Sequence, residues 1–388
     1  MIFEQEEGPA KTGHLKHLTH AEDEHIHNGE LGAEHAYNLL HSVHKQMTGQ
    51  GGEDTKTTVK YDGSPSIVFG IHPETGAPFV ASKSAFNKNP KINYTPEDID
   101  RNHGHAPGLA EKLKAALKYL PKILPKEGGV YQGDLMYTKD DVQKDGDKVS
   151  FKPNLITYST SRNSPAGKKV AKAKIGVVVH TKYEGGSLED MNATPDVDHS
   201  KFGEHPDVHL INPEIKNPPH EYDEKLQKQF HGHMAKAREV AHSLTPDDYR
   251  AVEGHETNLE AHINDMVKQE ARPSVGGYIA HLERKRDRDV EKLKSEAGKN
   301  KTADRYNGLI DHVRQNADSF AKMLDFHTHI QNAKNALVRG MGNPTEFEHT
   351  INGEKTDPEG FVSVRNGKMS KLTNRVEFNR KNFLARPR

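Results

Sequence analysis

The chain has 388 residues, of which 32% are hydrophobic and 29% are charged, so much of it must be solvated surface spread over roughly two or three domains. Lys and Arg total 55 against 56 Asp and Glu, which excludes an overall attraction to nucleic acid or to anionic membranes. The absence of cysteine excludes disulfides and cysteine nucleophiles. Because neither a membrane-length apolar run nor a secretory signal is present, we expect no membrane partner and a cytoplasmic location, in the host if the chain is viral.

Histidine is frequent, with 26 in the chain, and several form H-x-H pairs. A tetrahedral metal site needs three or four ligands that converge from different elements, whereas these pairs are dispersed along the sequence. We therefore expect solvated surface histidines and no dedicated metal site among the pairs His25 and His27, His103 and His105, His231 and His233, and His327 and His329.

The first half of the chain predicts mostly antiparallel β structure. A helical segment over 34–43 ends near a glycine cluster, and two apolar runs joined by turn residues 72–76 then predict a hairpin. Helical spacing follows over 107–120. Further strands are predicted over 129–137, 149–158 and 174–181, the last of them continuous enough in apolar residues to be buried on both faces.

The second half changes to helices and returns to strands at its end. Capping patterns around Thr245 and Ser274 favour helices over 222–243, 247–270, 275–297 and 303–339. The charge-rich stretch 282–294 is more typical of a solvated helix face than of a nucleic-acid-binding ridge. Strand character resumes at 359–364 and at 371–372. We therefore expect an α+β fold of antiparallel sheets with helices, formed by 1–190 plus 340–388 and interrupted by an all-α insertion over 200–338.

Lys60-Tyr61-Asp62-Gly63 is the first motif that could carry chemistry. A lysine attacks phosphorus only when its amine is uncharged, and the glycine permits close backbone approach. Four residues alone are weak evidence, but further motifs follow in a fixed order. They are Ser82-Lys83, Gly133-Asp134-Leu135, Glu359-Gly360-Phe361-Val362 and Lys371-Leu372.

This ordered set resembles the covalent nucleotidyltransferase superfamily of ATP-dependent DNA ligases, RNA ligases and capping enzymes, and is most similar to phage-type RNA ligases. The resemblance covers roughly 55–185 and 350–380. It implies a ligase-type adenylyltransferase domain that joins 5′-phosphate and 3′-hydroxyl ends through a covalent lysyl-AMP, with RNA favoured as substrate. It also implies ATP as the donor, which the motifs do not distinguish from GTP.

The resemblance also implies residue roles. Lys60 is implied as the nucleophile and Asp62 as a second catalytic residue close to it. Carboxylates Asp134 and Glu359 are implied as ligands of Mg²⁺, or of Mn²⁺ in its place, and hard oxygen ligands suit such ions. The remaining nucleotide contacts are implied for Gly63, Ser82, Lys83, Phe361 and Lys371.

Several features depart from the family pattern. Strand 174–181 lacks the aromatic residue that stacks on adenine, so Tyr183 or Phe361 is expected to substitute. Met369 stands where a second lysine is usual, with Lys368 or Arg375 as candidates to compensate. Only 17 residues follow Lys371, too few for the OB-fold of DNA ligases and capping enzymes.

The missing OB-fold leaves alternatives open. The helical insertion is then expected to contact substrate, or to bind a protein partner. A DNA nick ligase in which the insertion replaces the OB-fold is the second hypothesis. A non-catalytic nucleic-acid-binding protein that retains the fold is the third. The intact motif residues argue against it, namely Lys60, Asp62, Asp134, Glu359 and Lys371.

Overall fold

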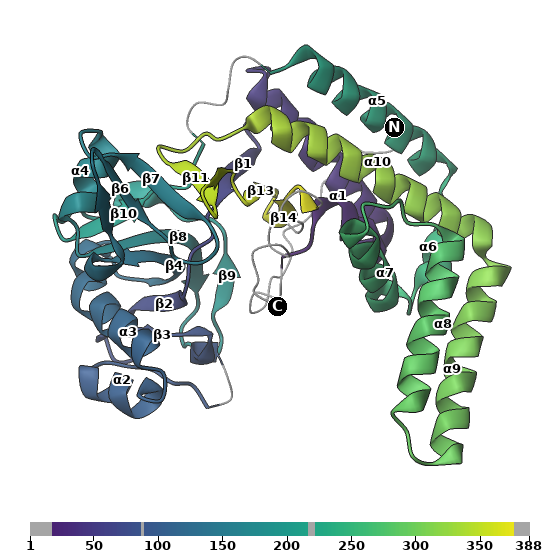
Figure 1. The fold of residues 1–388 in the computed structure, drawn as a ribbon, viewed down its shortest axis with the longest axis horizontal. Coiled ribbons are helices and arrows are strands. Elements are labelled where there is room, and N and C mark those ends of the chain that lie inside the picture. The colour runs from purple at the N-terminus through teal and green to yellow at the C-terminus, as the bar shows by residue number, and fades with distance from the viewer. Residues whose placement is uncertain (1–17, 87–88, 216–221, 376–388) are drawn as a thin grey trace.

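Three β-sheets and ten α-helices form the part of the chain that the computed structural model describes, residues 18–86, 89–215 and 222–375. The class is mixed α+β with largely antiparallel sheets, as predicted. Figure 1 shows a β-rich lobe on the left and a helical lobe on the right. A small sheet of β1, β13 and β14 lies between the two lobes.

The largest sheet has six strands and carries the core of the β-rich lobe. Its strands are antiparallel, except that β10 is parallel to β8. Helix α3 and the 3-10 turn after it cover one face, where Ile67, Leu135 and Val177 are completely buried. The strand order is β10 (Val208–Ile211), β8 (Ile175–Glu184), β4 (Val130–Thr138), β2 (Ser66–Ile71) and β3 (Pro78–Ala81), with β9 (Asn192–Thr194) paired to β8.

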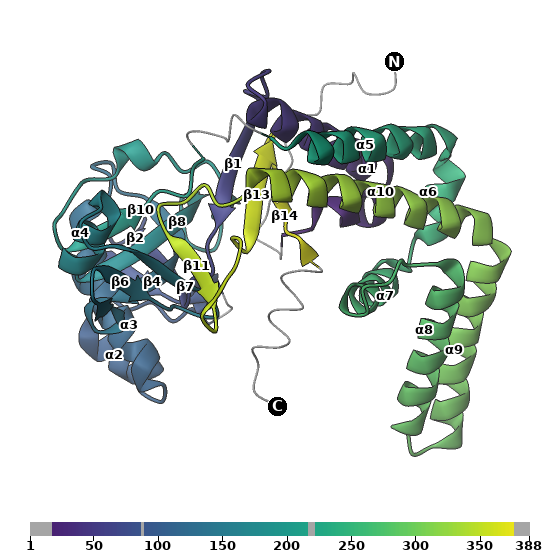
Figure 2. The ribbon, with the colours of Figure 1, turned by 45° about the horizontal axis from the view of Figure 1, so that its top comes forward.

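The other two sheets join strands that precede the helical region to strands that follow it (Figure 2). In the three-stranded sheet, β1 (Thr55–Lys60) pairs with β13 (Gly360–Arg365), which pairs with β14 (Lys368–Leu372). In the five-stranded sheet the order is β12 (Glu354–Lys355), β11 (Glu348–Ile351), β7 (Thr157–Ser161), β6 (Lys148–Phe151) and β5 (Gln143–Asp145). The chain between β10 and β11 is helical where described, so helices do interrupt a β-rich part.

The helical lobe is built on α1, α5 and α10, which share one apolar core that includes Leu39, Phe230 and Ile330. Helices α8 and α9 form a hairpin that projects from it (Figures 1 and 2). Within the described residues no helix has the length and hydropathy needed to cross a bilayer. The helices are α1 (Glu24–Met47), α2 (Pro96–His103), α3 (Pro107–Tyr119), α4 (Pro165–Lys172), α5 (Glu224–Ser243), α6 (Pro246–Val252), α7 (Glu256–Lys268), α8 (Val275–Glu291), α9 (Glu296–Gln315) and α10 (Ala317–Met341).

Most predicted elements are present, and the differences have local causes. Thr245 and Ser274 cap α6 and α8 as predicted, each by accepting a backbone hydrogen bond. The single helices expected over 247–270 and 303–339 are each divided in two, at Gly254 with φ +80° and at Asn316. The expected strand 149–158 is two strands separated by a turn that contains Pro153. Since β10 belongs to the large sheet, the helical part begins at α5, not at residue 200.

A fully buried ionic cluster connects the residues before α1 to helix α10 and to the residues after β14. Lys334 Nζ lies 2.6 Å from Glu22 Oε1, and both side chains are 0% exposed. Arg375 donates to both carboxylate oxygens of Asp23 at 3.0 and 2.8 Å, and His327 Nε2 lies 2.9 Å from Asp23 Oδ1. Burial opposes ionisation, but Lys334 and Arg375 hold the pKa of Glu22 at about 2.

Many histidines are buried, so the expectation of solvated surface histidines is wrong for them. Within the described residues no group of three or more His, Asp or Glu is arranged to hold a metal ion. Most of the buried histidines instead contact aromatic rings or form hydrogen bonds, such as His25 Nε2 to Met323 O at 3.0 Å. They are His25, His35, His44, His72, His103, His209, His255, His262, His281, His327 and His349.

We expect the folded state to lose stability as the pH falls from about 6.5. Burial lowers the pKa of His25 to about 3 and that of His209 and His262 to about 4. Between pH 4 and 6.5 the unfolded chain therefore binds protons that the folded chain does not, and stability rises with pH. One such histidine contributes on the order of 2 kcal/mol of this loss at pH 5. Urea unfolding at pH 7, 6 and 5 measures it, by far-UV circular dichroism because tryptophan is absent.

The variant His262→Leu should weaken this pH dependence, because His262 is 0% exposed and its burial lowers its pKa to about 4. His242→Gln is the matched control, since His242 is exposed near the end of α5. An unfolding midpoint that stays constant between pH 7 and 5 in the wild type contradicts the prediction.

Candidate functional site

The three-stranded sheet brings together two of the predicted lysines and one predicted carboxylate. Lys60 is the last residue of β1 and lies opposite Gly360 of β13, next to Glu359. Lys371 of β14 lies opposite Val362 of β13. Antiparallel pairing thus places Lys60, Glu359 and Lys371 near the same end of the sheet.

Lys60 and Glu359 form a close, partly buried ion pair. Lys60 Nζ lies 2.5 Å from Glu359 Oε1, and the two side chains are 28% and 15% exposed. Burial raises the pKa of Glu359, although Lys60 opposes the rise. Its second oxygen, Oε2, is buried without a hydrogen-bond partner among the described residues. One carboxylate oxygen of Glu359 therefore contacts the Lys60 amine. The other is free, among the described residues, to take a proton or a cation.

Lys371 provides a second amine close to Lys60. Burial lowers its pKa, and the positive charge of Lys60 lowers it further. In the described part of the chain no carboxylate lies within ion-pair distance of Lys371, while its backbone N–H donates to Thr19 O at 2.9 Å. This amine is thus held in position by its backbone and left available to an anion.

A cavity of about 610 Å³ opens beside these lysines, between the three-stranded and six-stranded sheets. Lys60, Lys371 and Asp134 all line it. Gly63 lines it too, and a Cβ at this position would lie 2.5 Å from Asp134 Cβ. Ser64 N donates to Leu135 O at 3.0 Å, which fixes the loop after Gly63 against β4. The glycine of the motif is thus required for close contact between the lysine loop and the aspartate strand.

The cavity also has an aromatic wall. Phe86 and Tyr183 both line it, with ring centroids 4.5 Å apart. The Tyr183 hydroxyl donates to Gln132 Oε1 at 2.6 Å, and Gln132 is a further lining residue. Sequence reasoning missed Phe86, because a 3-10 turn gives no alternating pattern. Gln132 could have been found, since it lies two residues before Asp134 and so faces the same side of β4.

Asp62 is occupied by structural contacts. Its carboxylate accepts hydrogen bonds from Asn154 Nδ2 at 2.8 Å, Leu155 N at 2.9 Å and Ile156 N at 3.2 Å. Its own N–H donates to the Tyr158 hydroxyl at 2.8 Å. Asp62 is 8% exposed and is not a cavity-lining residue. It therefore fixes the lysine loop to the turn between β6 and β7, and its contacts do not support the direct catalytic role predicted for it.

The other predicted nucleotide contacts are less well placed. The Ser82 hydroxyl lies 2.8 Å from that of Ser84 and not in the cavity wall. Lys83 begins a 3-10 turn, and its side chain lies outside the described part of the structure. Phe361 is 1% exposed within the main core and does not line the cavity, in contrast to Val362 beside it.

The proposed substitutes also differ in their positions. Tyr183 does reach the cavity, as does Met369, which stands where a lysine was expected. Arg375 is committed to Asp23 in the buried ionic cluster, so its guanidinium does not compensate for the missing lysine.

The comparisons with known proteins give a family and no activity. The model of a family of unknown function, DUF6267, matches residues 15–386. The chain belongs to this family. No curated protein and no solved structure matches it. What this DUF6267 protein does must therefore be inferred from its own site.

In this DUF6267 protein, Asp134 and Glu359 suit a small hard cation whose other ligands are oxygens of a phosphate and of water. Asp134 Oδ2 lies 3.6 Å from His180 Nε2, and Glu359 Oε2 is the buried, unpartnered oxygen described above. Magnesium commonly binds one or two protein carboxylates together with substrate phosphates. The two carboxylates thus fit a Mg²⁺ ion that arrives bound to a nucleotide. They do not fit a site in which every ligand comes from the protein.

Proposed function

We propose that this protein is an ATP-dependent polynucleotide ligase, with RNA as the favoured substrate, that works through a covalent lysyl-AMP. The observation that carries the proposal is the Lys60–Glu359 pair, which lies beside a cavity that a second lysine, Lys371, also lines. The order of motifs along the chain supports the same function. The finer fold assignment, a ligase-type adenylyltransferase domain, is part of this proposal.

The first step is attack of Lys60 on the α-phosphorus of ATP. The amine must first lose a proton, and Glu359 Oε1 is the acceptor in contact with it. Burial raises the pKa of Glu359, which favours that transfer. The lysine nitrogen then forms a bond to the α-phosphorus, the bond from this phosphorus to the bridging oxygen breaks, and pyrophosphate leaves.

Two further transfers complete the reaction. A 5′-phosphate oxygen of the polynucleotide attacks the same phosphorus and displaces Lys60, which gives an adenylated end. A 3′-hydroxyl oxygen then attacks the 5′-phosphorus, AMP leaves, and a phosphodiester forms. In-line phosphoryl transfers of this kind depend mainly on positioning and on neutralisation of charge.

The remaining residues bind and orient the nucleotide. Lys371 faces the phosphates, because its amine is unpaired within the described residues and lines the cavity. Phe86 and Tyr183 offer aromatic surface to the base. Asp62 acts as a positioning residue for the lysine loop. Asp134 and Glu359 are the carboxylates that would hold Mg²⁺, and the ion would supply positive charge to the phosphate oxygens.

Incubation of the purified protein with α-labelled ATP and Mg²⁺ tests the proposal. We expect label that remains on the protein after denaturation and is released by mild acid, as a phosphoramidate is. ATP labelled on the γ-phosphate should leave no label, because that phosphate departs with pyrophosphate. A wild type that takes no α-label from either ATP or GTP contradicts the proposal.

Substrate comparison separates the two ligase hypotheses. Sealing of single-stranded RNA or of an RNA nick supports the favoured substrate, whereas sealing confined to a DNA nick supports the alternative of a DNA nick ligase. Binding of nucleic acid without any adenylation leaves the non-catalytic alternative.

A further inference from the structure

Helix α4 presents lysines to solvent over a buried apolar stripe. Ala166 and Val170 are buried against strands β6 and β7, whereas Lys168, Lys169 and Lys172 are exposed. The spacing of i, i+3 and i+4 places the three lysines on adjoining parts of the outer surface. The segment 148–174 around them contains no Asp or Glu.

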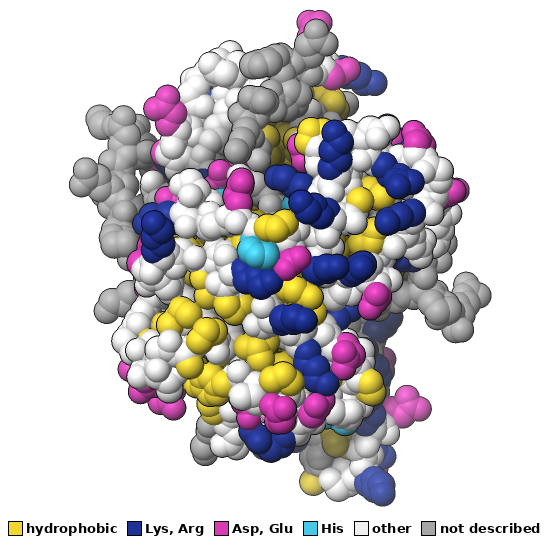
Figure 3. Space-filling model, turned by 90° about the vertical axis from the view of Figure 1, so that its left-hand side faces the viewer, with side chains coloured by type: hydrophobic (Ala, Val, Ile, Leu, Met, Phe, Trp, Pro, Cys, Tyr) yellow, Lys and Arg dark blue, Asp and Glu magenta, His cyan; other side chains and the backbone are white. Residues whose placement is uncertain are grey.

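These cations form an uncompensated basic surface, which we call the α4 basic surface. In the described part of the chain none of its members has a carboxylate within ion-pair distance. Figure 3 faces this side of the molecule and shows Lys and Arg side chains gathered in its upper half. The surface comprises Lys168, Lys169 and Lys172.

The charge-rich helix α8 differs from this surface. Its Arg286 and Arg288 lie 2.9 and 3.5 Å from Asp287 and Asp289. Arg314 of α9 lies 3.6 Å from Glu283 of α8. Two of the cations on α8 therefore have an acidic neighbour, in contrast to the three lysines of α4.

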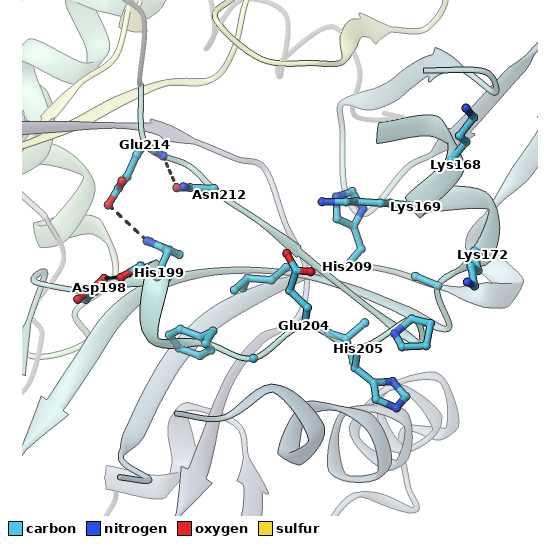
Figure 4. Close-up of a pocket in the computed structure, with 17 residues that line it drawn as sticks. Lys168, Lys169, Lys172, Asp198, His199, Glu204, His205, His209, Asn212 and Glu214 are labelled. Atoms are coloured by element: carbon cyan, nitrogen blue, oxygen red, sulfur yellow. Dashed lines mark hydrogen bonds and ion pairs between the residues drawn. The ribbon is translucent and has the colours of Figure 1, made fainter. Parts of the chain in front are cut away.

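A cavity of about 790 Å³ lies between α4 and the loop before β10. Figure 4 shows the three α4 lysines along one side of this cavity and Asp198, His199 and Glu214 on the opposite side. His199 is held there, with Nε2 2.9 Å from Val179 O and Nδ1 3.5 Å from Glu214 Oε1. The acidic groups of the far wall are thus partly engaged, whereas the three lysines form no ion pair with any described residue.

Shared wall residues connect this cavity to the Lys60 site. His199 lines both the α4 cavity and the cavity that contains Lys60. Lys169 lines the α4 cavity and also a smaller cavity of about 420 Å³, whose other residues include Val59 and Tyr61, the neighbours of Lys60. The basic surface and the reactive lysine therefore adjoin along one side of the molecule.

We propose that the α4 basic surface binds the phosphate backbone of the polynucleotide whose 5′-phosphate end enters the cavity at Lys60. This inference rests on the proposed function and adds the site of its second substrate. Several spaced, unpaired cations suit a repeating phosphate chain, whose binding is independent of base sequence. The near-zero net charge of the whole chain means that the attraction must come from such a local surface.

The test is charge reversal at the three exposed lysines, as K168E/K169E/K172E. A fluorescent, 5′-phosphorylated RNA oligonucleotide is titrated with the full chain, and anisotropy reports binding at several salt concentrations. We expect about tenfold or greater loss of affinity near physiological salt. The slope of log affinity against log salt concentration should be shallower by about two, since each lost phosphate contact to a single strand reduces this slope by roughly 0.7. Labelling by α-labelled ATP should remain at the wild-type level, because that step needs no polynucleotide.

The control K292E/K294E/K301E makes the same charge change at the end of the α8–α9 hairpin, where all three lysines are exposed. It should keep wild-type RNA affinity. Unchanged RNA affinity in the α4 variant overturns the inference, as does an equal loss in the control. Because anisotropy needs no ATP, a wild type that binds RNA through α4 but takes no label refutes the proposed ligase alone.

Discussion

Replacement of Lys60 by alanine is expected to remove covalent labelling by α-labelled ATP, to below about a thousandth of the wild-type rate, as loss of a catalytic nucleophile commonly does. The physical reason is that a lysyl-AMP needs the Lys60 nitrogen, and alanine offers no atom in its place. Glu359 then loses the positive charge 2.5 Å away, and because burial raises its pKa it can take up a proton in place of an ion pair. Denaturing gels after incubation with nucleotide measure the label.

Two further variants separate chemistry from charge. Lys60→Arg keeps a cation beside Glu359, but a guanidinium stays protonated and cannot attack. Lys56→Arg is the matched control, because Lys56 lines the same cavity from the same strand, yet its amine is bound to Val197 O at 2.9 Å and to Glu214 at 2.8 Å. Label that persists in Lys60→Arg, or vanishes equally in Lys56→Arg, refutes the assignment of the nucleophile.

The second large effect is expected from Lys334→Met in the buried ionic cluster. The substitution leaves the Glu22 carboxylate fully buried without its closest cation, 2.6 Å away. Breaking a buried pair by removing one partner costs about 3–5 kcal/mol. Urea unfolding at pH 7 should show a free energy of unfolding lower by that amount.

The double variant Glu22→Met/Lys334→Met tests whether the loss of stability comes from the unpaired, buried Glu22 carboxylate. Replacement of both partners by apolar side chains of similar size is often close to neutral, so the double variant should recover most of the lost stability. A double variant that is as unstable as the single one, or a single variant that unfolds like the wild type, contradicts this account.

The sequence was informative wherever local chemistry determines structure. Side-chain caps at Thr245 and Ser274 and the apolar run of β8 are local signals, and these elements form as predicted. Strand β10 was missed because it is short and is defined by pairing with β8, which the sequence does not display. Helix α4 was missed because its apolar stripe, with Ala166 and Val170 among its members, is only one turn or two long.

For the candidate site, the order of motifs identified four residues that the structure places close together. Lys60, Asp134 and Lys371 line one cavity, and Glu359 contacts Lys60. The sequence could not show which way a side chain points where the backbone is irregular. Asp62 therefore was predicted as catalytic but contacts the turn after β6. The buried histidines were misjudged for a related reason, since composition does not reveal which of them enter a core.

The pairing of β1 with β13 has a consequence for how the protein is made. Lys60 leaves the ribosome before the whole helical region, whereas the strand that carries Glu359 toward it is synthesised only after that region. A nascent or truncated chain that ends before β13 contains the lysine motif without Glu359 and without Lys371. Under the proposed function, such a chain would therefore have no complete nucleotide site and should take no label from ATP.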